Sequence, residues 1–351
     1  MLNKTIKKIK CLDESAIKKV QIRLDNLTKP LGSLGRLEDI VKQLAGISGE
    51  HYPKVDRKTV VIMCADNGVT QENVSSCPKS VTSQVTKNFT KGFTGINIIS
   101  KHAKSEILVV DIGVDDDIDC KEIINKKIKN GTSNIAKGPA MSREEAIKAI
   151  ETGIDIIKKL KDDGFNLVGT GEMGIGNTTT SSAIASVLTG MSVERMVGKG
   201  AGLSTEGYKN KFDVIKRAIE INKPMKKDPI DVLSKLGGFD IAGLTGCFIG
   251  SAAYRMPIVI DGFISAVAAF VAYRIEPKVK DFMFPSHCSA EPGTSVILDE
   301  LGLEPMLSMK MRLGEGTGAA LAFNIFDVAV DLYNNMGTFE DAKIEQYLPL
   351  E

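Results

Sequence analysis

Short apolar runs alternate with longer segments of helical periodicity along most of this 351-residue chain. The runs are rich in β-branched residues and lie at 60–65, 107–112, 165–169, 257–260 and 282–284. Strands that alternate with helices form parallel sheets whose faces are covered by the helices. The pattern therefore predicts an α/β fold.

The two ends of the chain have helical patterns instead. Residues 14–27 and 34–47 show this pattern on either side of a break rich in proline and glycine, and a strongly apolar helical pattern covers 317–335. No linker or repeat marks a domain boundary. We expect the terminal helices to pack beside one another, so that any small domain is built from both chain ends.

Polar residues follow each of the apolar runs. Parallel sheets bind ligands beyond the carboxyl ends of their strands, so these residues are expected to meet at one edge of the sheet. Strand-to-helix loops are polar in any α/β protein, however, and several of these side chains are equally suited to capping helices. The residues are Asp66, Asn67, Asp111, Gly171, Glu172, Asp261, Ser286 and His287.

The overall composition excludes some classes of partner. With 45 basic and 44 acidic residues, the chain has no net field that would attract nucleic acid or an anionic membrane. It has no run of roughly 18 apolar residues and no signal-peptide pattern. Its six cysteines and three histidines show no metal or disulfide spacing. We therefore expect a cytoplasmic protein without nucleic-acid or membrane partners and without a metal site.

The densest chemical signal is the glycine-rich segment GEMGIGNTTTSSA at 171–183, which follows an apolar run and leads into a helical pattern. Glycines let a backbone approach a ligand closely, and free N–H groups at the start of a helix favour an anion such as phosphate. The segment lacks the Gly-Lys-Ser/Thr of a P-loop and the spacing of a dinucleotide-binding fingerprint. A phosphate loop and a merely tight turn are the two interpretations.

Two further glycine clusters lie downstream. The first, VGKGAGLS at 197–204, contains Lys199 and is followed by Lys211; these lysines either add positive charge to a phosphate site or remain solvated. In the second, RLGEGTG at 312–318, Glu315 lies between glycines just before the apolar helical pattern. The helix dipole favours the ionised carboxylate, which can accept a proton or cap the helix.

Two polar segments complete the candidate site. Residues 74–85 are rich in hydroxyl and amide side chains, and 285–293 contains His287 next to Cys288. No third residue has the spacing of a metal ligand, so we expect a neutral, hydrogen-bonded histidine and a cysteine that fills space. The acidic run at 115–119 is expected to be a solvated loop.

Sequence blocks along nearly the whole chain resemble those of one family, the nicotinate-nucleotide dimethylbenzimidazole phosphoribosyltransferases. Each glycine motif alone is weakly specific, but the blocks occur together in the family's order. Asn67 is a departure, since the family commonly has histidine there, and KGFTGIN stands where GGAAIN is usual. The blocks are KPLGSLGRLE, ADNGV, VSSCPKSVTSQV, GEMGIGNTTTSSA, VGKGAGL, LGGFDIAGLTG, DGFISA, SHCSAEPG and LGEGTGAAL.

The resemblance implies a Rossmann-like parallel sheet of about six strands flanked by helices. It also implies a small helical domain at 1–50 and 317–351, and a large nucleotide-binding catalytic domain at 51–316. The family's members are homodimers whose active sites lie near the subunit interface. No cofactor is implied.

The resemblance further implies the roles of individual residues. Glu315 corresponds to the family's general base. The nucleotide and its phosphate would be bound by Glu172, Gly174, Gly176, Asn177, Thr178, Lys211 and Ser289. The base would lie against Ser75, Ser80, Gln84 and Leu313.

The implied reaction transfers the 5-phosphoribosyl group of nicotinate mononucleotide to 5,6-dimethylbenzimidazole or a related base. The products are α-ribazole 5′-phosphate, used in the nucleotide loop of cobalamin, and nicotinate. The leaving pyridinium nitrogen departs neutral and needs no acid, so one proton acceptor, Glu315, is enough. The alternatives are transfer to another lower-ligand base and a non-catalytic nucleotide-binding sensor. The sensor is disfavoured because binding alone does not require a base at Glu315.

Overall fold

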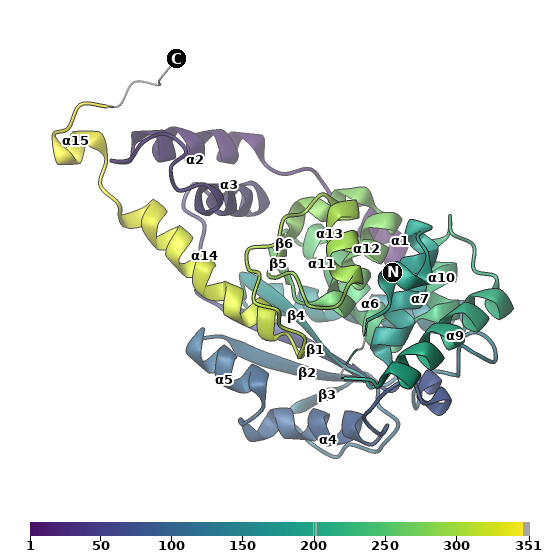
Figure 1. Ribbon diagram of the computed structural model, residues 1–351. Coiled ribbons are helices and arrows are strands. Elements are labelled where there is room, and N and C mark those ends of the chain that lie inside the picture. The colour runs from purple at the N-terminus through teal and green to yellow at the C-terminus, as the bar shows by residue number, and fades with distance from the viewer. Residues whose placement is uncertain (199, 201, 347–351) are drawn as a thin grey trace.

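A computed structural model describes residues 1–198, 200 and 202–346 of the chain (Figure 1). The strands form one parallel six-stranded sheet in the order β3-β2-β1-β4-β5-β6, which confirms the predicted α/β fold. The edge strand β3 has no counterpart among the predicted runs, because it has only three residues and is partly exposed. The strands are β1 Lys58–Ala65, β2 Glu106–Gly113, β3 Ile123–Asn125, β4 Leu167–Met173, β5 Ile258–Ile260 and β6 Met283–Pro285.

Helices connect the strands and form both ends of the chain. The helix predicted at 317–335 begins and ends at those residues, and the two predicted N-terminal helices differ from α2 and α3 by at most two residues at either end. No helix in the described part of the chain is both long and apolar enough to cross a membrane. The helices are α1 Leu2–Ile6, α2 Glu14–Asn26, α3 Arg36–Ser48, α4 Val81–Asn88, α5 Gly95–His102, α6 Arg143–Asp162, α7 Asn177–Thr189, α8 Val193–Met196, α9 Thr205–Asn222, α10 Pro229–Leu236, α11 Phe239–Ala253, α12 Phe263–Ile275, α13 Gly293–Leu301, α14 Thr317–Asn335 and α15 Phe339–Ala342.

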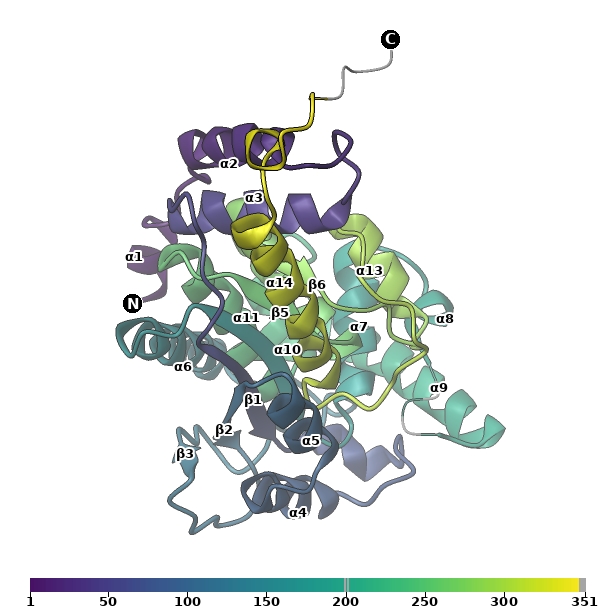
Figure 2. The ribbon, with the colours of Figure 1, turned by 90° about the vertical axis from the view of Figure 1, so that its left-hand side faces the viewer.

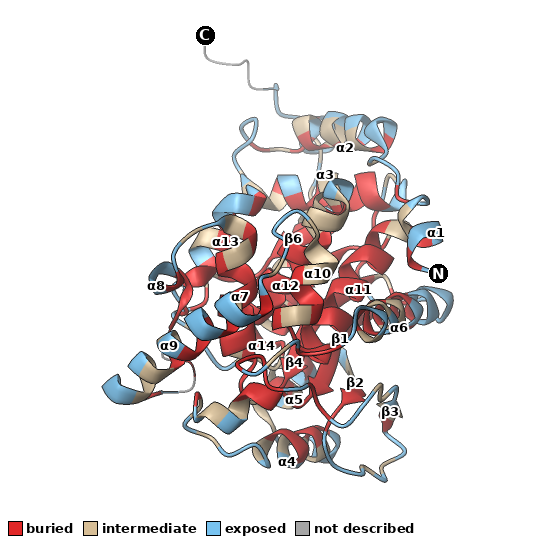
Figure 3. Ribbon diagram, turned by 90° about the vertical axis from the view of Figure 1, so that its right-hand side faces the viewer, coloured by how far each residue is buried: buried red, intermediate tan, exposed pale blue. Residues whose placement is uncertain are grey.

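Helices cover both faces of the sheet. Successive residues of a strand point to opposite faces, so Val60 and Met63 of β1 lie on different faces. A side chain at Gly316, just before α14, would meet Val60, whereas one at Gly243 in α11 would meet Met63. α14 therefore packs on one face together with α5 (Figure 2), and α11 and α12 pack on the other, where almost every residue is buried (Figure 3).

The packing of α6 against α11 depends on glycine. A methyl group at Gly153 of α6 would lie 2.0 Å from the carbonyl oxygen of Gly243, and one at Gly246 of α11 would lie 1.9 Å from that of Ile150. The two helices therefore touch backbone to backbone, with no space for a larger residue. Because α11 also packs on β1 and β2, this contact holds α6 close to the sheet.

The helices of the two chain ends lie side by side, as expected (Figures 1 and 2). α14 packs on α3 and α3 on α2, Leu27 forms an isolated bridge with Thr338, and the Arg23 guanidinium of α2 donates a 3.0 Å hydrogen bond to the carbonyl of Tyr333 near the end of α14. α14 also packs on β1 and β4, and α1 packs on α6 and α11, so both connect the chain ends to the sheet. Residues 347–351 of the proposed small domain lie outside the described residues, and the domain boundaries remain predictions.

The strand order reverses between β1 and β4. The chain runs outward from β1 to β3 and then returns to place β4 on the other side of β1. Loops that leave two neighbouring strands in opposite directions open a crevice at the carboxyl ends of those strands, which is where sheets of this type bind ligands. Asp66 and Asn67 follow β1 at this edge, and Glu172 lies near the end of β4.

Replacing Gly153 with alanine is expected to lower the free energy of unfolding by about 1–3 kcal/mol, because the added methyl group must push α6 away from α11. Equilibrium unfolding in urea, followed by circular dichroism, measures the change. Gly138→Ala is the matched control, since its methyl group would have no neighbour within 4 Å. We expect it to change the free energy of unfolding by less than about 0.5 kcal/mol. Equal stability of the two variants would contradict the backbone contact.

Candidate active site

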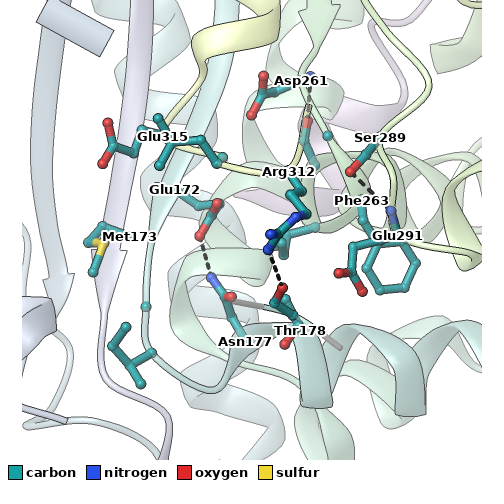
Figure 4. A pocket seen from close by; sticks show the side chains of 18 of the residues that line it. Glu172, Met173, Asn177, Thr178, Asp261, Phe263, Ser289, Glu291, Arg312 and Glu315 are labelled. Atoms are coloured by element: carbon teal, nitrogen blue, oxygen red, sulfur yellow. Dashed lines mark hydrogen bonds between the residues drawn. The ribbon is translucent and has the colours of Figure 1, made fainter. Parts of the chain in front are cut away.

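A cavity of about 290 Å³ opens at this crevice. Its lining comes from the end of β4 and the loop that follows it, the residues after β5, the loop after β6 and the turn before α14 (Figure 4). Val81 and Val85 of α4 complete one wall. Residues from separate sequence motifs therefore meet in one place.

Glu315 reaches the cavity from a turn that lies directly on β4. Gly314, Glu315 and Gly316 all have positive φ angles, of 83°, 62° and 90°. A side chain at Gly171 would lie 2.5 Å from the carbonyl oxygen of Glu315, so glycine in β4 is what allows the turn to approach. Backbone packing thus sets the position of the Glu315 carboxylate.

The Glu315 carboxylate does not cap the helix that follows it. Gly316 is the N-cap residue of α14, and Oε2 of Glu315 instead accepts a 3.4 Å hydrogen bond from the amide of Ile96 at the start of α5. Asp261, just after β5, caps α14. Of the two interpretations made from the sequence, the structure favours a carboxylate that is available to the cavity.

Two carboxyl groups in this cavity differ in their proton affinity. Burial raises the pKa of Glu315, the Ile96 amide opposes the rise, and the charge of Asp261 adds to it. Burial also raises the pKa of Glu172 to about 8, although Glu172 accepts a hydrogen bond from the Asn177 amide. Glu172 therefore keeps its proton at neutral pH, which leaves Glu315 as the proton acceptor of the pair.

Asn177 joins two buried carboxyl groups. Its Nδ2 donates to Oε2 of Glu172 and, over 3.0 Å, to Oδ2 of Asp240 in α11. Burial raises the pKa of Asp240 to about 6, against the hydrogen bond from Asn177. The buried Asn67 amide, where the family commonly has histidine, lies beside Asp240. The Asn177 side-chain nitrogen is thus engaged within the protein, and it anchors the start of α7.

The opposite side of the cavity carries positive charge. Lys211 of α9 is fully buried and donates a 2.8 Å hydrogen bond to the Thr178 hydroxyl. Burial lowers the pKa of Lys211 to about 8, against the attraction of Glu291. Arg312 donates to the carbonyl of Gly200 over 3.2 Å. These cations lie beside the first residues of α7, so this side is suited to an anion.

Most of the predicted site residues line the cavity. Lys211 lies behind Thr178 rather than in the lining, and Lys199 falls outside the described residues. Ser80 and Gln84 line a separate hollow of about 480 Å³ on another face of α4. The predicted residues that line the cavity are Ser75, Glu172, Gly174, Gly176, Asn177, Thr178, Ser289, Leu313 and Glu315.

The geometry of α4 explains why Ser80 and Gln84 line the separate hollow and not the cavity. Val81 and Val85 are four residues apart and face the cavity. Ser80 and Gln84 each precede one of these valines, so they lie about 100° further round the helix. Ser80 and Gln84 were expected to contact the base because of the family resemblance, whereas helical periodicity is the signal that identifies the apolar pair.

Other residues of the cavity lie within the sequence motifs but were not predicted as site residues. Met173 and Ile175 add apolar surface, and Figure 4 shows Met173 on the same side of the cavity as Glu315. Glu291 lies on the other side, with Arg312 between the two sides (Figure 4). Oε2 of Glu291 is buried and has no hydrogen-bond partner among the described residues. The glycine clusters predicted that these segments belong to the site, but the spacing of the glycines does not indicate which side chains between them face a ligand.

His287 and the acidic run both have polar partners within the chain. Nδ1 of the buried His287 lies 3.0 Å from a neighbouring serine hydroxyl. No group of histidine, cysteine, aspartate and glutamate in the described part of the chain has the arrangement of a metal site. Asp115 and Asp116 form ion pairs with Lys79 and Lys87, so the acidic run is a surface loop with neighbouring counter-charges.

Known proteins resemble this chain along its whole length. A sequence model described as Phosphoribosyltransferase matches residues 9–344. A nicotinate-nucleotide–dimethylbenzimidazole phosphoribosyltransferase of Ruminiclostridium cellulolyticum is 66% identical over 346 residues, which cover 99% of this chain and 98% of the relative. A protein of the same name from Acetivibrio thermocellus is 64% identical over 349 residues, which cover 99% of both chains.

A solved structure shows the same fold. The crystal structure of CobT from Thermus thermophilus has a TM-score of 0.90 to this chain at 35% sequence identity, covering 95% of this chain and 100% of that one. The fold and the sequence are thus both similar to those of one group of enzymes. The chain belongs to the nicotinate-nucleotide–dimethylbenzimidazole phosphoribosyltransferase family.

Proposed function

We propose that this chain transfers the 5-phosphoribosyl group of nicotinate mononucleotide to 5,6-dimethylbenzimidazole, giving α-ribazole 5′-phosphate and nicotinate for the nucleotide loop of cobalamin. The observation that carries the proposal is Glu315, a carboxylate fixed by backbone packing between an apolar wall and a positively charged, glycine-lined side of one cavity. The names of relatives at 64% and 66% identity support the same reaction. We place the reaction in the cytoplasm, where the six free cysteines stay reduced.

The phosphate of the nucleotide fits the side of the cavity at α7. Gly176 is the N-cap residue of this helix, with a φ of 94°, and it brings backbone to the cavity without a side chain. N–H groups at the start of a helix favour an anion, and Lys211 and Arg312 add positive charge. Ser289 contributes a hydroxyl to the same lining. We propose that the nucleotide then extends across the cavity, with C1′ of its ribose toward Glu315.

The reaction needs one proton acceptor. The bond between C1′ and the pyridinium nitrogen breaks with its electron pair moving to that nitrogen, so nicotinate leaves without protonation. One nitrogen of the benzimidazole attacks C1′ from the opposite face and inverts the β-linked sugar to the α form. The proton on the second nitrogen becomes acidic as the new bond forms, and Glu315 accepts it. General-base catalysis of this kind contributes about 10²–10⁴-fold.

The base fits the apolar side of the cavity. Val85, Met173 and Leu313 offer apolar surface there, and Glu315 lies beside them. A flat, largely apolar ring system gains free energy from burial against such a wall, while its single N–H needs one polar partner. The carboxylate supplies that partner. This arrangement supports a benzimidazole as the acceptor.

We also propose that the chain acts as a homodimer. Ile98 on α5 is 59% exposed, and Leu313 is 61% exposed although it lines the cavity. The two lie close together, because Gly95 and Ile98 share a face of α5 and a side chain at Gly95 would lie 2.8 Å from Leu313. Phe93, also 61% exposed, precedes the helix. A second copy on this strip would remove apolar surface from water and cover the apolar side of the cavity.

Replacing Glu315 with glutamine is expected to reduce kcat by about 10²–10⁴-fold, because the amide keeps the shape of the side chain but cannot accept the proton. Nicotinate release from nicotinate mononucleotide and dimethylbenzimidazole is the measurement. Glu220→Gln, on the exposed face of α9, is the matched control and should leave kcat unchanged. Wild-type turnover by Glu315→Gln would remove this residue from the mechanism. Nucleotide binding by the wild type without nicotinate release would indicate a sensor.

Replacing Lys211 with methionine is expected to raise the KM for nicotinate mononucleotide by about 10- to 100-fold, since the positive charge behind Thr178 no longer attracts the phosphate. The KM for the base should not change, and Lys209→Met, exposed on the same helix, should behave as wild type. Because burial lowers the pKa of Lys211 to about 8, the lysine loses its charge as the pH rises through that value. Wild-type kcat/KM for the nucleotide should therefore fall above about pH 8. An unchanged nucleotide KM in Lys211→Met would contradict a role for this charge in nucleotide binding.

Replacing Ile98 with lysine is expected to convert a wild-type dimer into a monomer, because a charge in the centre of the apolar strip cannot be buried without a partner. Sedimentation equilibrium at micromolar concentration measures the mass. Ile221→Lys, at a position on α9 that is 47% exposed, is the matched control and should remain dimeric. A monomeric wild type, or a dimeric Ile98→Lys, would show that this strip is not the interface.

A further inference from the structure

Asp261 holds the turn that carries Glu315. It lies just after β5, is 3% exposed, and accepts three hydrogen bonds from the backbone at the start of α14. Oδ1 accepts from the amides of Gly318 and Ala319 at 2.7 and 3.2 Å, and Oδ2 accepts from the amide of Gly316 at 3.2 Å. A carboxylate from a distant part of the sequence thus takes the place of an N-cap side chain.

The turn needs this support. Glu315 has a φ of 62°, in the left-handed region that is unfavourable for a residue other than glycine. The N-cap residue Gly316 has no side chain to satisfy the free amides of the first helical turn. Asp261 supplies the missing acceptor, and its bond to the Gly316 amide is one residue away from Glu315.

Asp261 is itself fixed by the neighbouring elements. Its backbone amide donates to Oγ1 of Thr170 on β4 at 3.3 Å and to Oγ of Ser265 on α12 at 3.2 Å. Its carbonyl oxygen accepts a 3.2 Å hydrogen bond from Oγ of Ser286, just after β6. Hydrogen bonds from β4, α12 and the loop after β6 therefore hold the backbone of Asp261 in place, and with it the carboxylate.

His287 stabilises the ionised form of Asp261. A methyl group at Gly318 would lie 2.0 Å from Nδ1 of His287 and 2.9 Å from Oδ1 of Asp261. The imidazole ring and the carboxylate therefore both lie against the Cα of Gly318, close to each other. Burial raises the pKa of Asp261, and the attraction of His287 and the three amide hydrogen bonds oppose the rise. A carboxyl group that accepts three N–H donors is best satisfied without its proton.

Several groups face Glu315 from the elements around it. The Ile96 amide of α5 lowers its pKa, and the charge of Asp261 raises it. Glu172 of β4, Arg312 of the preceding loop and His287 also line the cavity. Among these, Asp261 combines a charge effect with direct hydrogen bonds to the backbone of the turn.

We propose that Asp261 is a positioning residue for Glu315, an inference that rests on the proton transfer proposed above. Its hydrogen bonds to the amides of Gly316, Gly318 and Ala319 hold the backbone at the start of α14, so that the Glu315 carboxylate stays directed into the cavity. Its negative charge also makes that carboxylate a stronger base.

The test is Asp261→Asn. Asparagine keeps the shape of the side chain. Its NH₂ group, however, cannot accept the amide hydrogen bonds of the carboxylate oxygen that it replaces, and the charge beside Glu315 is lost. We expect kcat to fall by about 10²-fold, the cost of a small misplacement of a catalytic group. The acid limb of the kcat–pH profile should move to lower pH, because loss of the charge lowers the pKa of Glu315. The KM for the nucleotide should change far less than kcat.

Asp228→Asn is the matched control. Asp228 also caps a helix, accepting from the amides of Ile230 and Asp231 at the start of α10, and it is not part of the cavity lining. The control should lose stability without a change in kcat or in the acid limb. If Asp261→Asn likewise loses stability alone, Asp261 is only a structural cap and the proposal is overturned.

Two further measurements separate the possible failures. If Asp261→Asn does not fold, Asp261→Glu takes its place, since it keeps the charge but shifts the carboxylate by one methylene. This variant should lower kcat and leave the acid limb in place. A wild-type kcat in Asp261→Glu would overturn the proposal. A ¹³C NMR titration of the Glu315 carboxyl group reads its pKa without turnover. An unmoved pKa in the folded Asp261→Asn variant overturns the positioning role, whereas a wild type that releases no nicotinate contradicts the proposed reaction instead.

Discussion

The contact between the turn at 314–316 and the carboxyl end of β4 is the constraint on which the site depends. Gly171 removes the side chain that would hold the two apart, so the carbonyl of Glu315 rests directly on the strand. The same turn begins α14, which packs on the sheet and on α3. The sheet therefore sets the position of Glu315, so that the proposed general base is carried by a rigid element.

Three buried carboxyl groups lie in or beside the cavity, and their burial is offset in two different ways. Glu172 and Asp240 share the Asn177 amide, and burial raises the pKa of both, to about 8 and about 6. Asp261 instead accepts three backbone amides, which oppose the rise that burial causes in its pKa. A buried carboxyl group is costly unless it is protonated or hydrogen-bonded in one of these ways. Glu315, less buried and with one long amide contact, is the group left free to exchange a proton with a ligand.

The sequence predicted what depends on local pattern and missed what depends on packing. Periodicity was sufficient for the parallel sheet and for α14, and the resemblance placed Glu315 and the α7 loop at one site. The strand β3 was missed because it is only partly buried and ends in a polar residue, whereas the equally short β5 and β6 are fully buried. Which face of α4 meets the cavity depends on its contacts with other elements, so Val85 rather than Gln84 lines the wall. Asp261 contacts an amide 55 residues away, and no local signal reveals that.

Leu313 connects the chemistry to association between copies of the chain. It lies two residues before Glu315, lines the cavity and is 61% exposed. In a single chain, a base packed on Leu313 would stay open to water on that side. A second copy over the strip with Ile98 would bury Leu313, the bound benzimidazole and the Glu315 carboxylate further. Because burial is already the main cause of the raised pKa of Glu315, this added burial would raise that pKa again. Glu315 would then be a stronger base in the dimer than in the monomer, so the proposed assembly and the proposed proton transfer depend on the same surface.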